Sequence, residues 1–257
     1  MSYRPTAADF NALFRGSVYG NYDIFTARSY GDFVRRNDIA LERAISSFDE
    51  RLIGTIAFAQ RGERAWLSLM GVRPDLRGRG HGKALFGAAV DTVIASGARS
   101  IEFEVVQRNV AAIAMYRSFG FSAIDELHVY ARRPLRAAAN DLAFRRFGER
   151  SVTRIANGTP ACWQREAVAV VRAAPLALIE RDGAYAFVRM RGENGVLVDA
   201  GARDAAAAHA LLDELDRRVS CDLTLPNEPS RSPLAVAMRE RGWRVVERQH
   251  RMQRTIA

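Results

Sequence analysis

The spacing of apolar residues along the first half of the chain predicts a mixed sheet with helices on its faces. Residues 3–14 are predicted to form a short strand and then a helix, and residues 16–38 an irregular aromatic segment. Charged turns separate the next three apolar runs, which is typical of an antiparallel meander. The strands predicted here are 44–48, 52–58, 65–72, 101–106 and 121–130, and the helices are 83–95 and 110–119. Helices alternate with strands after the meander, which favours a mixed α/β sheet.

The second half of the chain repeats this order of elements. Residues 132–142, RRPLRAAANDL, interrupt the pattern and are predicted to be a linker. The strands predicted after it are 176–180, 184–189, 195–198, 221–225 and 243–252, and the helices are 163–173, 204–218 and 233–241. A repeat of about 120 residues predicts two tandem copies of one fold, each a mostly antiparallel twisted sheet flanked by helices. We place the domains at residues 1–133 and 134–257.

Composition and charge exclude several classes of protein. The 257 residues contain no run of 18 apolar residues and no N-terminal secretory pattern, so we expect a cytoplasmic protein without a membrane segment. The net charge of +9 is spread over both halves, without the basic stripe of a nucleic-acid face. Cys162 and Cys221 share no metal-ligand spacing, and we expect both to be buried small hydrophobes. The histidines have no metal spacing either, so no metal is expected.

The glycine cluster after the third predicted strand carries the clearest chemistry. Residues 77–82, RGRGHG, join a strand to a helix, and glycines at 78, 80 and 82 let the backbone turn sharply. The amide groups of such a turn and of the following helix start converge on one point, where they bind a pyrophosphate well. A Walker loop is excluded because Ala84 follows Lys83, and a dinucleotide fingerprint because Lys83 stands where its third glycine belongs.

Two motifs at this point resemble the GCN5-related N-acetyltransferase (GNAT) superfamily. The loop of that family is Arg/Gln-x-x-Gly-x-Gly/Ala, which Arg77, Gly80 and Gly82 match. The second motif is formed by Asn109-x-x-Ala112, Met115-Tyr116 and Gly120-Phe121. The resemblance covers residues 3–132. It implies a GNAT fold, acetyl-CoA as co-substrate, and transfer of its acetyl group to a primary amine of a small molecule or peptide.

The resemblance also implies roles for individual residues. The backbone of Met70, Gly71 and Val72 would pair with the pantetheine arm, and the amides from Arg79 to Lys83 would hold the pyrophosphate. Asn109 would hydrogen-bond the pantetheine region, and Tyr116 would protonate the leaving thiolate as a general acid. The cofactor-binding residues expected in full are Met70, Gly71, Val72, Arg77, Gly78, Arg79, Gly80, His81, Gly82, Lys83, Asn109, Ala112 and Tyr116.

The base and the acceptor site are less defined by sequence. Glu104 alternates with Phe103 and Val105 and is a candidate base, although a surface carboxylate would show the same pattern. Acceptor contacts are expected in the aromatic segment, from Tyr19, Tyr22, Asp23, Phe25 and Tyr30. The same aromatic residues would equally suit a packed core.

The second half lacks the residues that carry this chemistry. The corresponding loop, residues 199–204, lacks the arginine at the first position of the motif and lacks the spaced glycines. Met238 stands at the position that corresponds to Tyr116. We therefore expect a degenerate GNAT-like domain without a CoA site, in a monomer or homodimer. The alternative function is a non-catalytic acyl-CoA sensor, against which the presence of Tyr116 argues.

Overall fold

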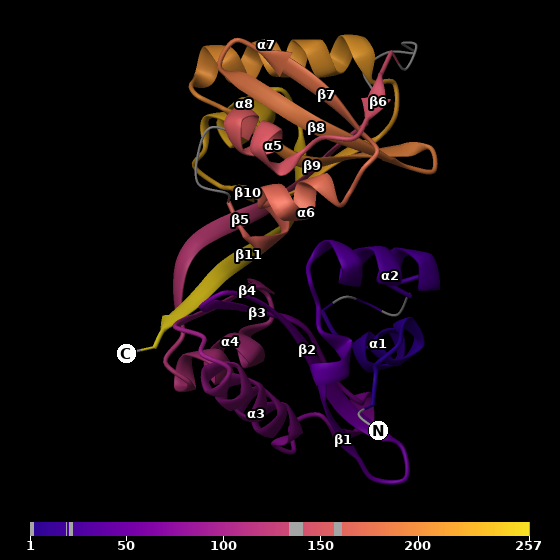
Figure 1. Cartoon of the computed structure of the whole chain (residues 1–257), viewed down its shortest axis with the longest axis vertical. Coiled ribbons are helices and arrows are strands. Elements are labelled where there is room, and N and C mark those ends of the chain that lie inside the picture. The colour runs from indigo at the N-terminus through magenta and orange to yellow at the C-terminus, as the bar shows by residue number, and fades with distance from the viewer. Residues whose placement is uncertain (1–2, 19, 21–22, 134–140, 157–160, 257) are drawn as a thin grey trace. The chain divides into compact units, whose positions relative to one another are not determined.

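The chain divides into two compact units. The computed structural model describes residues 3–18, 20, 23–133, 141–156 and 161–256. Unit 1 comprises residues 1–124 and 250–257, and unit 2 comprises residues 125–249. This division differs from the predicted boundary after residue 133, because β5 (Ser122–Arg132) and β11 (Arg244–Thr255) each contribute residues to both units (Figure 1).

The sheet of unit 1 begins with the predicted meander. Its strand order is β1-β2-β3-β4-β11, with β1 antiparallel to β2, β2 antiparallel to β3, and β4 parallel to β3. Besides β11, the strands of this sheet are β1 (Ile45–Phe48), β2 (Leu52–Arg61), β3 (Arg64–Val72) and β4 (Ser100–Val106). The C-terminal part of β11 completes this sheet, since Gln253 Nε2 donates to Ser100 Oγ on β4 at 2.9 Å.

Helices cover both faces of this sheet (Figure 1). They are α1 (Ala7–Phe14), α2 (Ala27–Arg36), α3 (His81–Ala95) and α4 (Val110–Ser118), with 3₁₀ turns at Leu41–Arg43 and Pro74–Leu76. Two glycines show how closely the layers approach. A Cβ added at Gly71 would lie 2.6 Å from Leu13 Cβ of α1, and one at Gly54 would lie 2.8 Å from Leu85 Cδ1 of α3.

The N-terminal segment of unit 1 differs from the prediction. Residues 3–6 form no strand, and Thr6 instead caps α1. Residues 27–36, predicted to be irregular, form α2, which begins at the capping residue Thr26. The prediction missed this helix although its apolar residues Ala27, Tyr30, Phe33 and Val34 recur at helical spacing and polar residues fill most other positions.

Unit 2 repeats the arrangement of unit 1. Its strand order is β5-β10-β9-β8-β7-β6, with antiparallel β7-β8-β9 and with β10 parallel to β9. The strands are β6 (Phe144–Arg145), β7 (Leu176–Arg181), β8 (Ala184–Arg191), β9 (Asn194–Ala202) and β10 (Leu223–Pro229). The helices are α5 (Glu149–Ala156), α6 (Ala167–Val171), α7 (Ala205–Arg218) and α8 (Pro233–Glu240).

Three elements of unit 2 were not predicted correctly. The helix expected over residues 163–173 is a 3₁₀ turn, Trp163–Arg165, followed by the short α6, and α5 and β6 were missed. Cys162 and Cys221 are buried free thiols, as expected. Within the described residues, no helix combines the length and the apolar character that crossing a membrane requires.

The contact between β2 and its neighbours makes Gly54 a sensitive position. A methyl group there would lie 2.7 Å from the backbone oxygen of Gly71, so we expect Gly54→Ala to lower the free energy of unfolding by about 1–3 kcal/mol. Gly31→Ala is the control, because Gly31 lies within α2 with open space around it, and it should be neutral or stabilising. Urea denaturation measures both, and equal stability of the two variants would contradict the packing described here.

Candidate active site

The loop that joins β3 to α3 exposes an uncapped helix N-terminus. Gly78 and Gly80 have φ values of +76° and +87°, which glycine adopts without strain. Gly80 is the N-cap of α3 and provides no side-chain acceptor, whereas Thr6 caps α1 and Asn109 caps α4. The first N–H groups of an α-helix need such acceptors, and a phosphate supplies them well. His81 and Lys83 lie in this first turn.

Arg77 anchors the loop to α1. Its guanidinium donates to the carbonyl oxygens of Leu13, Arg15 and Gly16 at 2.9, 2.7 and 2.8 Å, and its Nε donates to Val72 O at 3.2 Å. Burial lowers the pKa of Arg77 from its ordinary value. The side chain of Arg77 therefore holds the loop against α1, and its predicted part in cofactor binding stays a prediction.

The strands β3 and β4 diverge next to this loop. Their parallel pairing covers three positions and ends with Trp66 opposite Glu102. A shift in the register of β2 and β3 places an extra residue, Ser68, directly after this point. The β4-facing edge of Met70, Gly71 and Val72 consequently has no partner strand within the described chain. Such an edge can pair with an extended ligand.

Two predicted site residues, Asn109 and Tyr116, are positioned by contacts at the start of α4 and within it. Asn109 is the N-cap of the helix, and its Oδ1 accepts from the N–H of Ala112 at 3.4 Å. The ring of Tyr116 packs against Phe86 and Phe103, with centroid distances of 4.7 and 4.5 Å. These contacts place Tyr116 on the face of the sheet that α3 and α4 cover.

Glu104 lies on the opposite face of β4. Its Oε2 accepts from the indole Nε1 of Trp66 at 2.9 Å, whereas its Oε1 is buried without a hydrogen-bond partner in the described structure. Burial, and secondarily the charge of Glu102, raises the pKa of Glu104 to about 7, although the hydrogen bond from Trp66 opposes the shift. A carboxyl with this pKa is present as a base in a substantial fraction at neutral pH.

Comparison with known proteins identifies the first of the two units. Residues 19–121 match the model of the Acetyltransferase (GNAT) family. The chain carries a GNAT acetyltransferase domain. This match contains the glycine loop, the diverging strands and Tyr116.

Two curated relatives each match about a third of the chain. An acetyltransferase of Pectobacterium atrosepticum is 30% identical over 81 residues, which are 32% of this chain and 57% of that protein. The mycothiol acetyltransferase of Clavibacter michiganensis is 34% identical over 90 residues, which are 34% of this chain and 29% of that protein. The chain thus spans about half or less of the length of these relatives.

Solved structures resemble the fold of the whole chain. A putative acetyltransferase from Pyrococcus horikoshii has a TM-score of 0.70 at 14% identity and covers 99% of this chain and 89% of its own. A GCN5-related N-acetyltransferase from Sphaerobacter thermophilus has a TM-score of 0.68 at 16% identity, covering 99% of this chain and 95% of its own. At these levels of identity, the similarities show that the fold of the whole chain occurs in other solved structures.

The residues predicted to bind the acceptor have different environments in the GNAT domain. Tyr19 and Tyr22 lie outside the described residues. Asp23 is exposed and pairs with Arg15, with 3.2 Å between Oδ1 and Nη2. Tyr30 is only 7% exposed, and its hydroxyl donates to Pro5 O at 2.7 Å. The prediction for Tyr30 is therefore corrected, because it belongs to the core.

Sequence inspection missed the aromatic residues that lie beside Glu104. Trp66 donates to the carboxylate, and Phe33 of α2 packs against Trp66 with a centroid distance of 6.0 Å. Phe25 in turn packs against Phe33 at 5.7 Å, so it connects the predicted aromatic segment to this cluster. The pairing of Trp66 with Glu104 joins residues 38 positions apart, and only the register of β3 and β4 brings them together.

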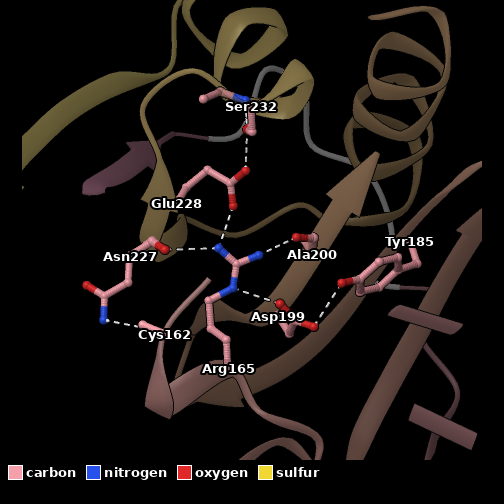
Figure 2. Close-up of polar contacts among 9 residues, drawn as sticks. Cys162, Arg165, Tyr185, Asp199, Ala200, Asn227, Glu228 and Ser232 are labelled. Atoms are coloured by element: carbon pink, nitrogen blue, oxygen red, sulfur yellow. Dashed lines mark hydrogen bonds and ion pairs between the residues drawn. The ribbon is translucent and has the colours of Figure 1, made fainter. Parts of the chain in front are cut away.

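In unit 2, side chains of the unit itself occupy the places that correspond to the uncapped helix start and the diverging strands of unit 1 (Figure 2). Asp204 caps α7 by accepting from Ala207 N at 2.9 Å, so the helix that corresponds to α3 already has an anionic cap. The pairing of β9 with β10 ends after two positions, and the guanidinium of Arg165 lies between the diverging strands. It donates to Ala200 O of β9 and to Asn227 O of β10.

The buried carboxyl of Glu104 predicts a pH dependence of stability. Because its folded-state pKa is raised to about 7 from 4.5, the wild type should lose stability relative to Glu104→Gln as pH rises through this interval. The loss should be on the order of 3 kcal/mol. Denaturant unfolding at pH 4 to 8 measures it, with the exposed Glu42→Gln as control. Parallel curves for wild type and Glu104→Gln would show that Glu104 has an ordinary pKa.

Proposed function

We propose that the protein is an acyl-CoA-dependent N-acetyltransferase that moves an acetyl group from acetyl-CoA to a primary amine of a small molecule or peptide. One observation carries this proposal: a single loop joins an uncapped helix N-terminus to a strand edge that has lost its partner. The first feature suits a pyrophosphate, and the second suits an extended amide-containing arm. Coenzyme A contains both groups in series.

In the proposed complex, the loop and the strand share the binding of the cofactor. The N–H groups from Arg79 to Lys83 hold the pyrophosphate, and the side chain of Lys83, the only lysine of the chain, adds a positive charge. The backbone of Met70, Gly71 and Val72 pairs with the pantetheine arm. The thioester then lies between the diverging parts of β3 and β4, where backbone N–H groups can stabilise an oxyanion.

The two faces of β4 supply the two proton transfers of the reaction. Phe103 packs against Tyr116 on one face, and Glu104 meets Trp66 on the other. The amine nitrogen attacks the thioester carbonyl carbon, and Glu104 accepts the proton that the nitrogen loses. The C–S bond then breaks, and the phenol of Tyr116 donates a proton to the thiolate. The products are the N-acetylated amine and free CoA.

Arginines of β3 and β11 stabilise the charge of Glu102 beside Glu104. Glu102 is 4% exposed, and its Oε2 accepts from Nε and Nη2 of Arg251 on β11 at 3.0 and 2.6 Å. Arg64 approaches its other oxygen at 3.8 Å. These arginines balance the charge of Glu102. Among the described residues, Oε1 of Glu102 and Oε1 of Glu104 both lack a hydrogen-bond partner, and it is the pKa of Glu104 that is raised to about 7.

A non-catalytic acyl-CoA sensor is the second candidate, because the same loop and strand edge would serve it. The two functions differ in their need for a general acid and a base. Tyr116 and Glu104 are both present, which favours the enzyme.

Replacement of Tyr116 separates binding from chemistry. We expect Tyr116→Phe to keep the packing against Phe86 and Phe103 and to lower kcat by about 10²- to 10⁴-fold, with nearly unchanged acetyl-CoA affinity. Release of free thiol during turnover with a panel of primary amines measures the rate. Tyr130→Phe, which removes the hydroxyl of a buried tyrosine in unit 2, controls for general effects on the fold. Equal turnover by Tyr116→Phe and wild type would remove the assigned role.

Calorimetric titration with acetyl-CoA tests the binding site itself. One site of micromolar affinity is expected, and Gly80→Val and Gly82→Val should abolish it by obstructing the loop. Gly97→Val is the control, since Gly97 has the same φ of +87° as Gly80 but lies at the far end of α3. Loss of binding in all three variants would indicate unfolding, and no binding by the wild type would end the acetyltransferase proposal. Two sites would contradict the arrangement described for unit 2.

A further inference from the structure

Unit 2 contains a cavity that the proposed reaction does not use. Its volume is about 970 Å³, which is large enough for an organic molecule. It extends from the segment around β6 and the start of α5 to the strands β8 and β9. All of its lining residues belong to unit 2.

The buried end of this cavity is a fixed polar network (Figure 2). Arg165 Nε donates to Asp199 Oδ1 at 2.7 Å, and Tyr185 donates to Asp199 Oδ2 at 2.9 Å. Glu228 accepts from Arg165 through one oxygen and from Ser232 through the other. Arg165, Asp199 and Glu228 are each at most 5% exposed. Every carboxylate oxygen of this network has a partner, so the network forms a rigid wall whose acidic groups are already engaged.

The accessible charges of the cavity are mainly positive. Outside the network, the ionisable lining residues are Arg145, Arg146, Arg181, Arg203 and Glu180, which are four cations and one anion. Arg181 pairs with Glu214, and Arg203 pairs with Asp204. Neither Arg145 nor Arg146 forms an ion pair with any described residue. An excess of arginine over acid at a cavity entrance favours an anionic ligand.

The geometry of Arg145 suits an oxyanion in particular. Its Cζ lies 4.6 Å from the ring centroid of Phe147, another lining residue. A guanidinium stacked in this way keeps its N–H groups free to bind a planar carboxylate or a phosphate by two hydrogen bonds. The side chains of Phe147, Leu178 and Tyr185 provide apolar surface beside it for the body of the ligand.

We propose that this cavity binds a small organic oxyanion, with its carboxylate or phosphate group on Arg145 and Arg146 and its apolar body against Phe147 and Leu178. The site is separate from the acetyl-CoA site of unit 1, and its existence does not depend on the proposed activity. Unit 2 has filled its cofactor position with Arg165 and Asp204, and the cavity beside that position is the ligand site it retains.

Ligand-observed NMR titration of the full chain tests this proposal with four probes of similar size. Benzoate and phenyl phosphate carry the two oxyanions, benzamide is the neutral counterpart of benzoate, and benzylamine is the cation. We expect at least one oxyanion to bind at least tenfold more tightly than benzamide and benzylamine, and to bind more weakly as salt is added. The relative affinities of benzoate and phenyl phosphate distinguish a carboxylate ligand from a phosphate ligand.

Two double variants locate the site. Arg145→Ala/Arg146→Ala should weaken binding of the oxyanion at least tenfold, and Arg145→Lys/Arg146→Lys should restore part of it. Arg244→Ala/Arg248→Ala removes the same charge from exposed positions of unit 2 on β11, outside the cavity, and should bind like the wild type. The proposal is overturned if benzamide or benzylamine binds as tightly as the oxyanions, if no probe binds, or if both alanine variants have the same affinity.

Discussion

The divergence of two parallel strands after Trp66 is the constraint on which the candidate active site depends. Up to that residue, β3 and β4 pair as neighbours in an ordinary sheet. Beyond it, β3 keeps its pairing with β2 only, so its other edge retains backbone groups that need partners. The extra residue Ser68 lies at this transition, where a bulge increases the local twist of the strand. The glycine loop follows at Arg77, which places the uncapped N-terminus of α3 beside the open edge.

The same divergence in unit 2 has a different outcome. There the guanidinium of Arg165 lies between β9 and β10 and donates to a carbonyl oxygen of each strand. Burial of an isolated guanidinium would cost several kcal/mol, and Asp199 and Glu228 offset this cost. In unit 2, Arg165 thus forms hydrogen bonds with backbone groups of the diverging strands. In unit 1, we propose that the cofactor arm forms the corresponding hydrogen bonds. The same architecture thus holds a structural side chain in unit 2 where we propose a cofactor in unit 1.

Arginines in unit 1 illustrate how partly buried charge supports a candidate site without taking part in chemistry. Arg77 joins the loop to the end of α1 through three carbonyl oxygens. Arg251 arrives on the last strand of the chain and neutralises Glu102. Neither residue needs to contact a substrate to affect the site. Arg77 positions the helix N-terminus, and Arg251 affects the electrostatic environment in which Glu104 titrates.

The sequence by itself was sufficient for the repeated order of elements, the mixed sheet and the glycine loop. These features depend on local periodicity and on the backbone freedom of Gly78 and Gly80, both of which are visible within a few residues. The predicted interval of α3 differs by two residues from the observed helix, and the three meander strands lie where their apolar runs predict them. The two motifs also predicted the family to which residues 19–121 belong.

Only the tertiary structure decided which side chains face one another and which are buried. Tyr30 looked like an acceptor contact because an aromatic residue suits both a surface and a core, and its burial depends on α1 and on Pro5. The environment of Glu104 comes from Trp66, Glu102 and Arg251. Glu102 and Arg251 lie 149 residues apart in the sequence, and strand pairing brings them together. The passage of β5 and β11 through both units likewise follows from long-range pairing. Local patterns carry no information on such pairing, because it is determined by contacts between distant segments.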